Sequence, residues 1–172
     1  IPALNEAGAI AAVVSDSLQR QVDWVIVADN GSNDETAGLA RRAGALVVHE
    51  PRRGYGYACA AGTARGIALG AHVLVYIDGD YSSLPAEMAR LLDPIAGNTA
   101  DLVLGSRVLG SISEGAMPPH QQLGNHLSSR LISLLYGFKV TDLGPYRAIR
   151  ADLVQGLGMR EMTFGWPTEM MV

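Results

Sequence analysis

The sequence predicts an α/β fold in which a doubly wound, mostly parallel β-sheet is flanked by helices. Short runs rich in β-branched residues alternate along the chain with segments whose apolar residues recur every three or four positions. This alternation is typical of strand–helix–strand units with right-handed crossovers. Hydrophobic residues make up 48% of the chain, enough for one sizeable core, and no repeat or low-complexity linker divides it. We therefore expect a single domain over residues 1–172.

The first half of the chain contains three predicted strands, each followed by a helix. The strands are expected at residues 1–4, 24–28 and 45–49. The first helix begins near Asn5-Glu6, and the third is a run of small residues from 58 to 69. Ser32 and Glu35 have the spacing of a capping box, which predicts the start of the second helix.

The second half begins with the strongest strand signal, residues 73–77, which leads directly into Asp78-Gly79-Asp80. Pro85 is expected to open the next helix, because proline fits the first helical turn. After Ser111 the regular alternation ends. The remaining expected elements are a strand at 101–104, a loop at 110–119, a helix at 123–136, an irregular segment leading into a strand at 142–150 and a helix at 151–157.

Composition argues against several classes of protein. The formal net charge is −4 and no dense Lys/Arg run is present, so the chain lacks the basic stripe of a nucleic-acid-binding protein. Cys59 is the only cysteine, which excludes an internal disulfide and a cysteine-based zinc site. No apolar run reaches the roughly 18–20 residues that a membrane-spanning helix needs.

Polar clusters follow four of the predicted strands at the point where each strand ends. They are Asn5-Glu6, Asp29-Asn30-Gly31-Ser32, Asp78-Gly79-Asp80 and Gly105-Ser106-Arg107. Such residues also terminate strands and cap helices, so one cluster alone carries little weight. Ligands of open α/β sheets bind beyond the carboxyl ends of the strands. Four clusters on one rim therefore favour a ligand site.

Asp78 and Asp80 are the candidate metal ligands. Two aspartates separated by one glycine after an apolar strand can direct carboxylate oxygens toward one point. Mg²⁺ and Mn²⁺ prefer oxygen ligands and bridge them to phosphate oxygens. A diphosphate leaving group needs this neutralisation as its bond breaks. The structural alternative is an Asp-Gly turn with a solvated second aspartate.

These motifs give the chain a family resemblance. It resembles the family 2 glycosyltransferases with the GT-A fold, in particular the branch of polyprenyl-phosphate (dolichol-phosphate) mannosyl- and glucosyltransferases. The segments that carry the resemblance, in the expected order, are residues 1–6, Asp29 to Thr36, Asp78-Gly79-Asp80, Gly105-Ser106-Arg107 and Asp142 to Ala148. They cover nearly the whole chain.

The resemblance implies a role for each segment. The first two would form the pocket for the base and ribose, and the Arg53 loop would contact the nucleotide. Asp78 would orient the donor, Asp80 would hold the metal, and Arg107 would lie near the donor sugar or the acceptor phosphate. The implied nucleotide-sugar-binding residues are Pro2, Leu4, Asn5, Glu6, Asp29, Gly31, Ser32, Arg53, Gly54, Asp78, Gly79, Asp80 and Arg107.

For the reaction, we hypothesise that an acceptor oxygen attacks the anomeric carbon from the face opposite the nucleotide diphosphate, which inverts the configuration. An acceptor alcohol needs a carboxylate that takes its proton. The candidates are Glu169, which the resemblance implies near the acceptor, and Asp142. A lipid phosphate is already anionic and needs no strong base. The resemblance implies a polyprenyl phosphate as one acceptor, and it leaves UDP-linked and GDP-linked donors open.

We expect the chain to be part of a longer protein, because it starts at Ile1 and ends at Val172 directly after a motif-like stretch. Residues 1–110 correspond to the nucleotide-sugar-binding part and residues 111–172 to the acceptor side. The expected location is the cytoplasm, at the cytoplasmic face of a membrane where the acceptor is a lipid. Any membrane association would come from segments outside these residues, and the oligomeric state is left open.

Two other functions stay open. A nucleotidyltransferase also pairs carboxylates around a metal, but it usually carries a Gly-rich loop where this chain has Asn5-Glu6-Ala7-Gly8-Ala9. A nucleotide-sugar-binding module without turnover would share the fold, although the intact Asp78-Gly79-Asp80 argues against it. A dinucleotide dehydrogenase is disfavoured, because no G-x-G-x-x-G follows the first strand.

Overall fold

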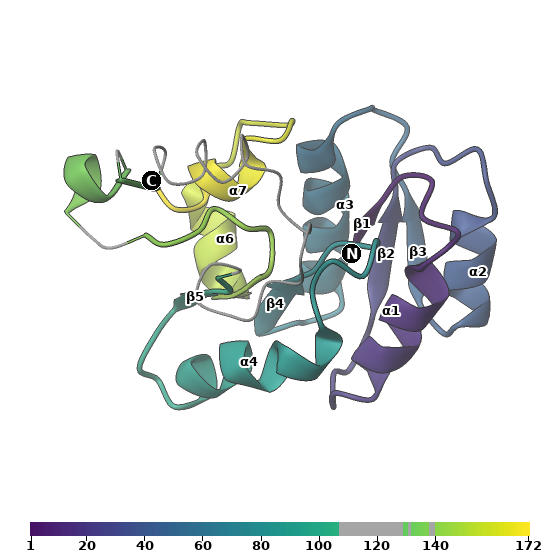
Figure 1. Ribbon diagram of the computed structural model, residues 1–172, viewed down its shortest axis with the longest axis horizontal. Coiled ribbons are helices and arrows are strands. Elements are labelled where there is room, and N and C mark those ends of the chain that lie inside the picture. Colours follow the sequence, from purple (N-terminus) through teal and green to yellow (C-terminus); the bar gives the residue numbers. More distant parts are fainter. Residues whose placement is uncertain (107–128, 131, 138–139) are drawn as a thin grey trace, which may run out of the picture.

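The computed structural model describes residues 1–106, 129–130, 132–137 and 140–172. These residues form two three-stranded sheets with helices packed around them (Figure 1). The loop expected at 110–119, half of the helix expected at 123–136 and Arg107 lie outside the described residues. Of that helix, residues 129–130 and 132–136 are described and are helical. No helix of the described part is long and apolar enough to cross a bilayer.

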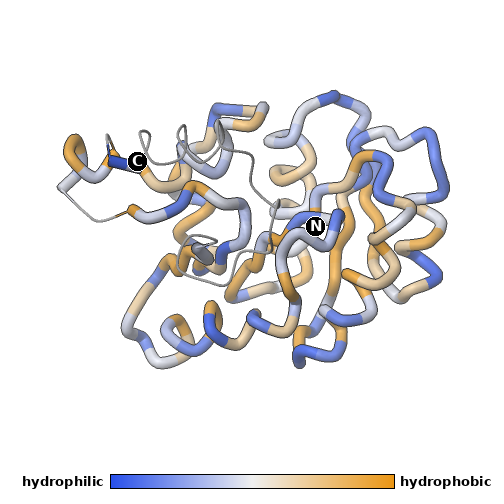
Figure 2. Tube along the Cα trace, in the orientation of Figure 1, coloured by the Kyte–Doolittle hydropathy of each residue, from blue (hydrophilic) through white to orange (hydrophobic). Residues whose placement is uncertain are grey.

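The first sheet is parallel, with strand order β1-β2-β3. Its strands are β1 (Pro2–Ala3), β2 (Ile26–Asp29) and β3 (Leu46–His49). Helices α1 (Ile10–Leu18) and α2 (Thr36–Arg42) pack together, while α3 (Tyr55–Ala68) packs against β2 and β1 (Figure 1). The parallel pairing places the carboxyl ends of all three strands at one edge, where the polar loops begin (Figure 2).

Alternating side chains of β2 explain how helices cover both faces of this sheet. Val27 is fully buried in a core cluster with Ile10 and Val14 of α1. The neighbouring residue Ala28 faces α3, because a Cβ on Gly62 would lie 3.7 Å from the Ala28 Cβ. Successive residues of a strand point to opposite faces, so the β-branched run fills both layers.

The second sheet has the order β4-β6-β5, and its middle strand is antiparallel to both neighbours. The strands are β4 (Val73–Tyr76), β5 (Leu102–Leu104) and β6 (Arg147–Arg150). Helix α4 (Met88–Ala96) follows the 3-10 turn η1 (Pro85–Glu87) and packs against β5 and β6. Helices α6 (Ala151–Leu157) and α7 (Trp166–Glu169) complete the described fold.

The predicted α/β fold class is confirmed, with two differences. The strand after Asp142 inserts antiparallel between β4 and β5, because the chain returns to the sheet from the opposite end. The predicted capping box is wrong: Glu35 precedes α2 and no side chain caps the helix. The Ser32 hydroxyl instead accepts the Asn5 backbone N–H at 2.9 Å, so it joins two loops.

The start of α3 packs directly on a distant segment near the end of the chain. The Gly56 backbone N–H donates to the Met162 carbonyl oxygen at 3.0 Å. A Cβ on Gly56 would lie 2.5 Å from Met162 Cα and 2.6 Å from the Glu161 carbonyl oxygen. Both obstacles are backbone atoms, so glycine is required at this contact.

We expect Gly56→Ala to lower the stability of the protein, because its methyl group would force two backbone segments apart. Overpacking of this kind costs about 1–3 kcal/mol, roughly 3–10 °C in Tm for a chain of this size. Gly156→Ala in α6 is the matched control, since nothing lies within 4 Å of its added Cβ. Thermal unfolding should show a loss for Gly56→Ala only; equal Tm values for both variants would contradict the packing.

Candidate functional site

The loops after β1 and β2 are joined through their polar side chains. The Asn5 side-chain oxygen accepts the Asn33 N–H at 2.8 Å, and Asn5 itself has a positive φ of 59°. The Glu6 N–H donates to Thr36 Oγ1 at 2.8 Å. Together with the contact between Asn5 and Ser32, these bonds fix the end of β1 beside the turn after β2.

Asp29 ends β2 and is buried, with 5% of its surface exposed. Its two carboxylate oxygens face the Ser32 N–H at 3.1 Å and the His49 Nδ1 at 3.3 Å. The buried carboxylate therefore shapes the turn and reaches the end of β3. His49 was not among the predicted site residues, because its position shows only in the register of β2 and β3.

Asn30 holds the loop that connects β3 to α3. Its side-chain amide donates to the carbonyl oxygens of Glu50 at 3.0 Å and Arg52 at 2.7 Å, and its oxygen accepts the Gly54 N–H at 2.8 Å. The side chain is 4% exposed, so it serves the loop rather than the solvent. This role was also missed from the sequence, where Asn30 reads as an ordinary turn residue.

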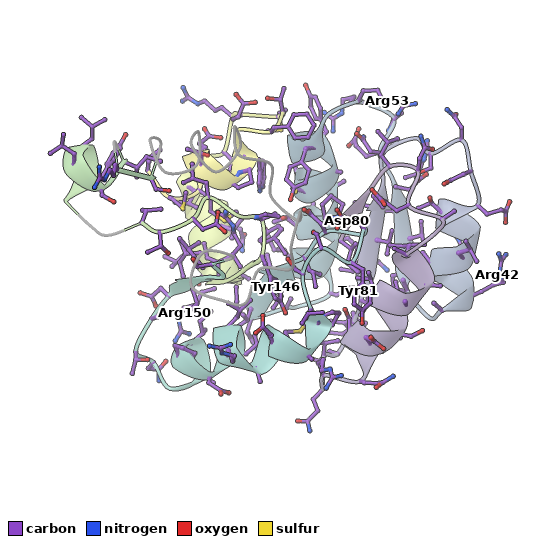
Figure 3. The ribbon with its side chains drawn as sticks, viewed as in Figure 1. Arg42, Arg53, Asp80, Tyr81, Tyr146 and Arg150 are labelled. Carbon is purple, nitrogen blue, oxygen red and sulfur yellow. The ribbon has the colours of Figure 1, made fainter. Side chains whose placement is uncertain are left out.

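The two arginines of this loop have different surroundings. Arg52 donates to both carboxylate oxygens of Glu50, at 2.8 and 2.7 Å, and these bonds lower the pKa of Glu50 to about 2. Arg53 is exposed and lies over Gly31, whose φ of +80° favours glycine. A Cβ on Gly31 would come within 3.6 Å of the Arg53 guanidinium. Arg53 is thus the basic side chain presented above the turn after β2 (Figure 3).

Gly79 brings the carboxylate pair against the end of β1. A Cβ at Gly79 would lie 3.3 Å from Ile10 Cδ1, 3.4 Å from Glu6 Cγ and 3.5 Å from the Pro2 carbonyl oxygen. The predicted residues Pro2 and Glu6 therefore meet the Asp78-Gly79-Asp80 turn, although more than 70 positions separate them in the sequence.

The two aspartates differ in exposure and partners. Asp80 is exposed, and one of its oxygens accepts the Ser82 N–H at 2.9 Å. Asp78 is half-buried and accepts the Tyr55 hydroxyl at 3.0 Å. Tyr81, with a φ of 63°, hydrogen-bonds Asp16 of α1 and so anchors the loop beyond Asp80 (Figure 3).

Negative charge accumulates at this rim. Burial raises the pKa of Glu6, and the neighbouring carboxylates of Asp80 and Asp78 raise it further. Within the described ranges, no group of three His, Cys, Asp or Glu side chains is arranged to hold a metal ion. Asp78 and Asp80 supply hard oxygen ligands, so a divalent cation here would need further oxygens from a bound molecule.

The two predicted acceptor-side carboxylates both interact with other groups of the protein. Glu169 accepts the Arg160 N–H at 3.0 Å and the Glu161 N–H at 2.7 Å, which holds the segment before α7. Asp142 is buried, with 2% of its surface exposed, and it interacts with another group of the protein. In the same region Arg147 is buried, and its guanidinium donates to the carbonyl oxygens of Pro167 and Gly144 at 2.5 and 2.6 Å.

Leu4 and Gly54 complete the predicted set. Leu4 is 41% exposed on the rim, an apolar surface beside the polar turns. Gly54 has a φ of +148°, and a Cβ there would collide with the Met162 carbonyl oxygen. A cavity of about 580 Å³ is lined along the whole of β4 and by residues of β2 and α3, extends to Trp24 and His72, and shares only Pro2 with the predicted site.

Comparison with known proteins agrees with this arrangement. The sequence model described as "Glycosyl transferase family 2" matches residues 1–158. The low-salt glycan biosynthesis hexosyltransferase Agl6 of Haloferax volcanii is 36% identical over 151 residues, covering 83% of this chain and 35% of that protein. The UDP-N-acetylglucosamine–dolichyl-phosphate N-acetylglucosaminyltransferase of Methanococcus voltae is 29% identical over 160 residues, covering 83% of this chain and 64% of its own.

A solved structure has the same architecture. Glucosyl-3-phosphoglycerate synthase from Mycobacterium tuberculosis, in complex with Mn²⁺, UDP-glucose and phosphoglyceric acid, matches with a TM-score of 0.75 and 26% identity. The match covers 99% of this chain and 61% of that one. The chain thus spans about one to two thirds of the length of these proteins. The family match over residues 1–158, together with this shared GT-A architecture, shows that the chain belongs to glycosyltransferase family 2.

Proposed function

We propose that the chain is the donor-binding part of a metal-dependent, inverting hexosyltransferase that uses a UDP-linked sugar. The contact of Gly79 with Pro2 and Glu6 carries the proposal, because it puts the carboxylate pair beside the loops that would bind a nucleotide. The mycobacterial relative was solved with Mn²⁺ and UDP-glucose, which favours UDP over GDP. A nucleotidyltransferase is disfavoured by the family match.

The rim offers a different chemistry for each part of such a donor. Leu4 would pack on the base, while the loops of Asn5, Glu6, Asp29, Gly31 and Ser32 would present backbone and carboxylate groups to the base and ribose. Arg53 and Gly54 would face the diphosphate. The side chains of Asn5 and Ser32 hydrogen-bond between the two loops. We therefore propose that they hold the loops in shape and do not contact the donor directly.

Asp80 and Asp78 would hold the cation, Mg²⁺ or Mn²⁺, together with the diphosphate oxygens. The cation would neutralise the charge that develops on the leaving diphosphate. Asp80 is exposed, which suits a carboxylate that binds a cation together with the donor. The coordination of the cation would be complete only when the donor is bound. Arg107 would act on the same charge, and it lies outside the described residues.

We propose that the acceptor is a phosphate, and specifically a polyprenyl phosphate. One relative is named for transfer to dolichyl phosphate, and the mycobacterial structure holds phosphoglyceric acid, so both names contain a phosphate-bearing molecule. A phosphate oxygen would form a bond to the anomeric carbon while the bond to the diphosphate breaks and its electron pair leaves with UDP. This step releases no proton, which fits the use of Glu169 in holding two backbone N–H groups.

The division of labour follows from this assignment. Residues 1–110 would bind the donor and residues 111–172 would form the acceptor side. A lipid phosphate acceptor would place this rim at the cytoplasmic face of a membrane. A module that binds the donor without turnover would share the donor site, so transfer itself has to be measured.

We expect UDP with Mn²⁺ to raise the Tm of the protein more than UDP alone, and GDP to have little effect. Ligand at 100 times its Kd stabilises by about 2.7 kcal/mol, roughly 5–11 °C here. Asp80→Asn should lose the metal-dependent part, while Asp93→Asn, an exposed aspartate of α4, should keep it. A larger shift with GDP, or no dependence on metal in the wild type, would overturn the proposed donor site.

We expect Glu169→Gln to destabilise the protein by about 1 kcal/mol, because the amide cannot accept two backbone N–H groups with a charged oxygen pair. Sugar transfer to a short polyprenyl phosphate should fall less than tenfold, with an unchanged pH profile. A general base would behave differently, since its loss costs about 10²–10⁴-fold in rate. A rate loss of that size at unchanged Tm would show that Glu169 takes a proton.

A further inference from the structure

The Tyr55 hydroxyl donates to Asp78 Oδ1 at 3.0 Å. We infer that Tyr55 is a positioning residue for Asp78, holding this carboxylate in the orientation that metal-dependent donor binding requires. The inference rests on the proposed function, because Asp78 acts on the donor only there. Fixing one oxygen of a carboxylate in advance lowers the cost of ordering it when a ligand binds.

Tyr55 is well placed for this role because its ring is held on several sides. It packs on the core cluster that contains Cys59 and Trp166. The Phe164 ring stacks on it, with centroids 6.1 Å apart and an interplanar angle of 25°. A tyrosine hydroxyl keeps its proton at neutral pH, so it remains a donor to the Asp78 carboxylate.

The segment that carries Phe164 is itself fixed. Met162 accepts the Gly56 N–H at 3.0 Å, which ties the segment to the first turn of α3. Glu169 holds Arg160 and Glu161 through their backbone N–H groups. A continuous set of contacts therefore runs from α7 through the 160–164 segment and Tyr55 to Asp78. The acceptor-side part of the chain thereby supports a donor-side carboxylate.

A buried tyrosine hydroxyl also needs a partner for purely structural reasons. Tyr76 provides the comparison, because its buried hydroxyl pairs with Thr63 Oγ1 at 2.7 Å, and Thr63 is not a predicted site residue. Removing the Tyr76 hydroxyl deletes a buried hydrogen bond and removing the Tyr55 hydroxyl deletes a part-buried one, but only Tyr55 reaches the carboxylate pair. The two variants therefore separate stability from positioning.

The test compares Tyr55→Phe with Tyr76→Phe in the 172-residue chain, using calorimetric titration with UDP in the presence and absence of Mn²⁺. Both variants should lower the Tm. Tyr55→Phe should bind UDP with Mn²⁺ about tenfold more weakly, as expected for a lost hydrogen bond to a charged group, and bind UDP alone within twofold of wild type. Tyr76→Phe should match wild type in both titrations.

A second pair tests the support from the 160–164 segment. Phe164 is 86% exposed, so Phe164→Ala should leave the fold intact and weaken binding of UDP with Mn²⁺ about threefold, in the same direction as Tyr55→Phe. Leu157→Ala, at an exposed apolar residue of α6, is the control and should have no effect. Wild-type affinity in Phe164→Ala would remove the segment from the proposal.

Tyr55→Phe with wild-type affinity for UDP and Mn²⁺ would overturn the positioning role and leave the proposed function standing. A wild-type protein that binds no UDP, with or without Mn²⁺, would instead contradict the proposed function. In that case the ¹³Cγ chemical shift of Asp78, measured without ligand at one pH, still decides the positioning role. It should change in Tyr55→Phe and not in Tyr76→Phe, and an unchanged shift in both rejects it.

Discussion

The contact between Gly79 and the end of β1 is the constraint on which the rest of the rim depends. A Cβ at this position would lie 3.3 Å from Ile10 Cδ1, 3.4 Å from Glu6 Cγ and 3.5 Å from the Pro2 carbonyl oxygen, so the turn after β4 packs closely on the end of β1. The contact joins the ends of two sheets that are otherwise separate in their strand pairing. The same contact brings the carboxylates of Glu6, Asp78 and Asp80 close together.

The resulting electrostatics follow from that geometry. Glu6 lies near Asp78 and Asp80, and its raised pKa records a site where the ionised form is disfavoured by burial and by like charges. Because folding raises the pKa of this carboxyl, its contribution to the free energy of unfolding falls as the pH rises through that pKa. A divalent cation bound here would offset the negative charge of these carboxylates. A ligand that binds together with such a cation would therefore stabilise the rim.

The sequence was sufficient for features that depend on neighbours along the chain. Consecutive apolar residues predicted β4, and the position of Asp78-Gly79-Asp80 directly after it followed at once. Features set by partners far along the chain were missed. Nothing near Arg147 reveals that β6 runs antiparallel between two strands, and nothing near Tyr55 reveals its bond to Asp78. Ser32 was predicted to cap a helix, but the Asn5 N–H competes for its hydroxyl.

Residues at the rim thus divide into two groups that a sequence cannot separate. The side chains of Asn30 and Ser32 hydrogen-bond to backbone atoms, and these bonds hold the loops in shape. Asp80, Arg53 and Leu4 are exposed on the loops so shaped. A carboxylate, a guanidinium and an apolar side chain are complementary to the cation, the diphosphate and the nucleobase of the proposed donor. Because Asn30 holds the loop that carries Arg53, a substitution at Asn30 is expected to disturb the proposed donor site as well as one at Arg53.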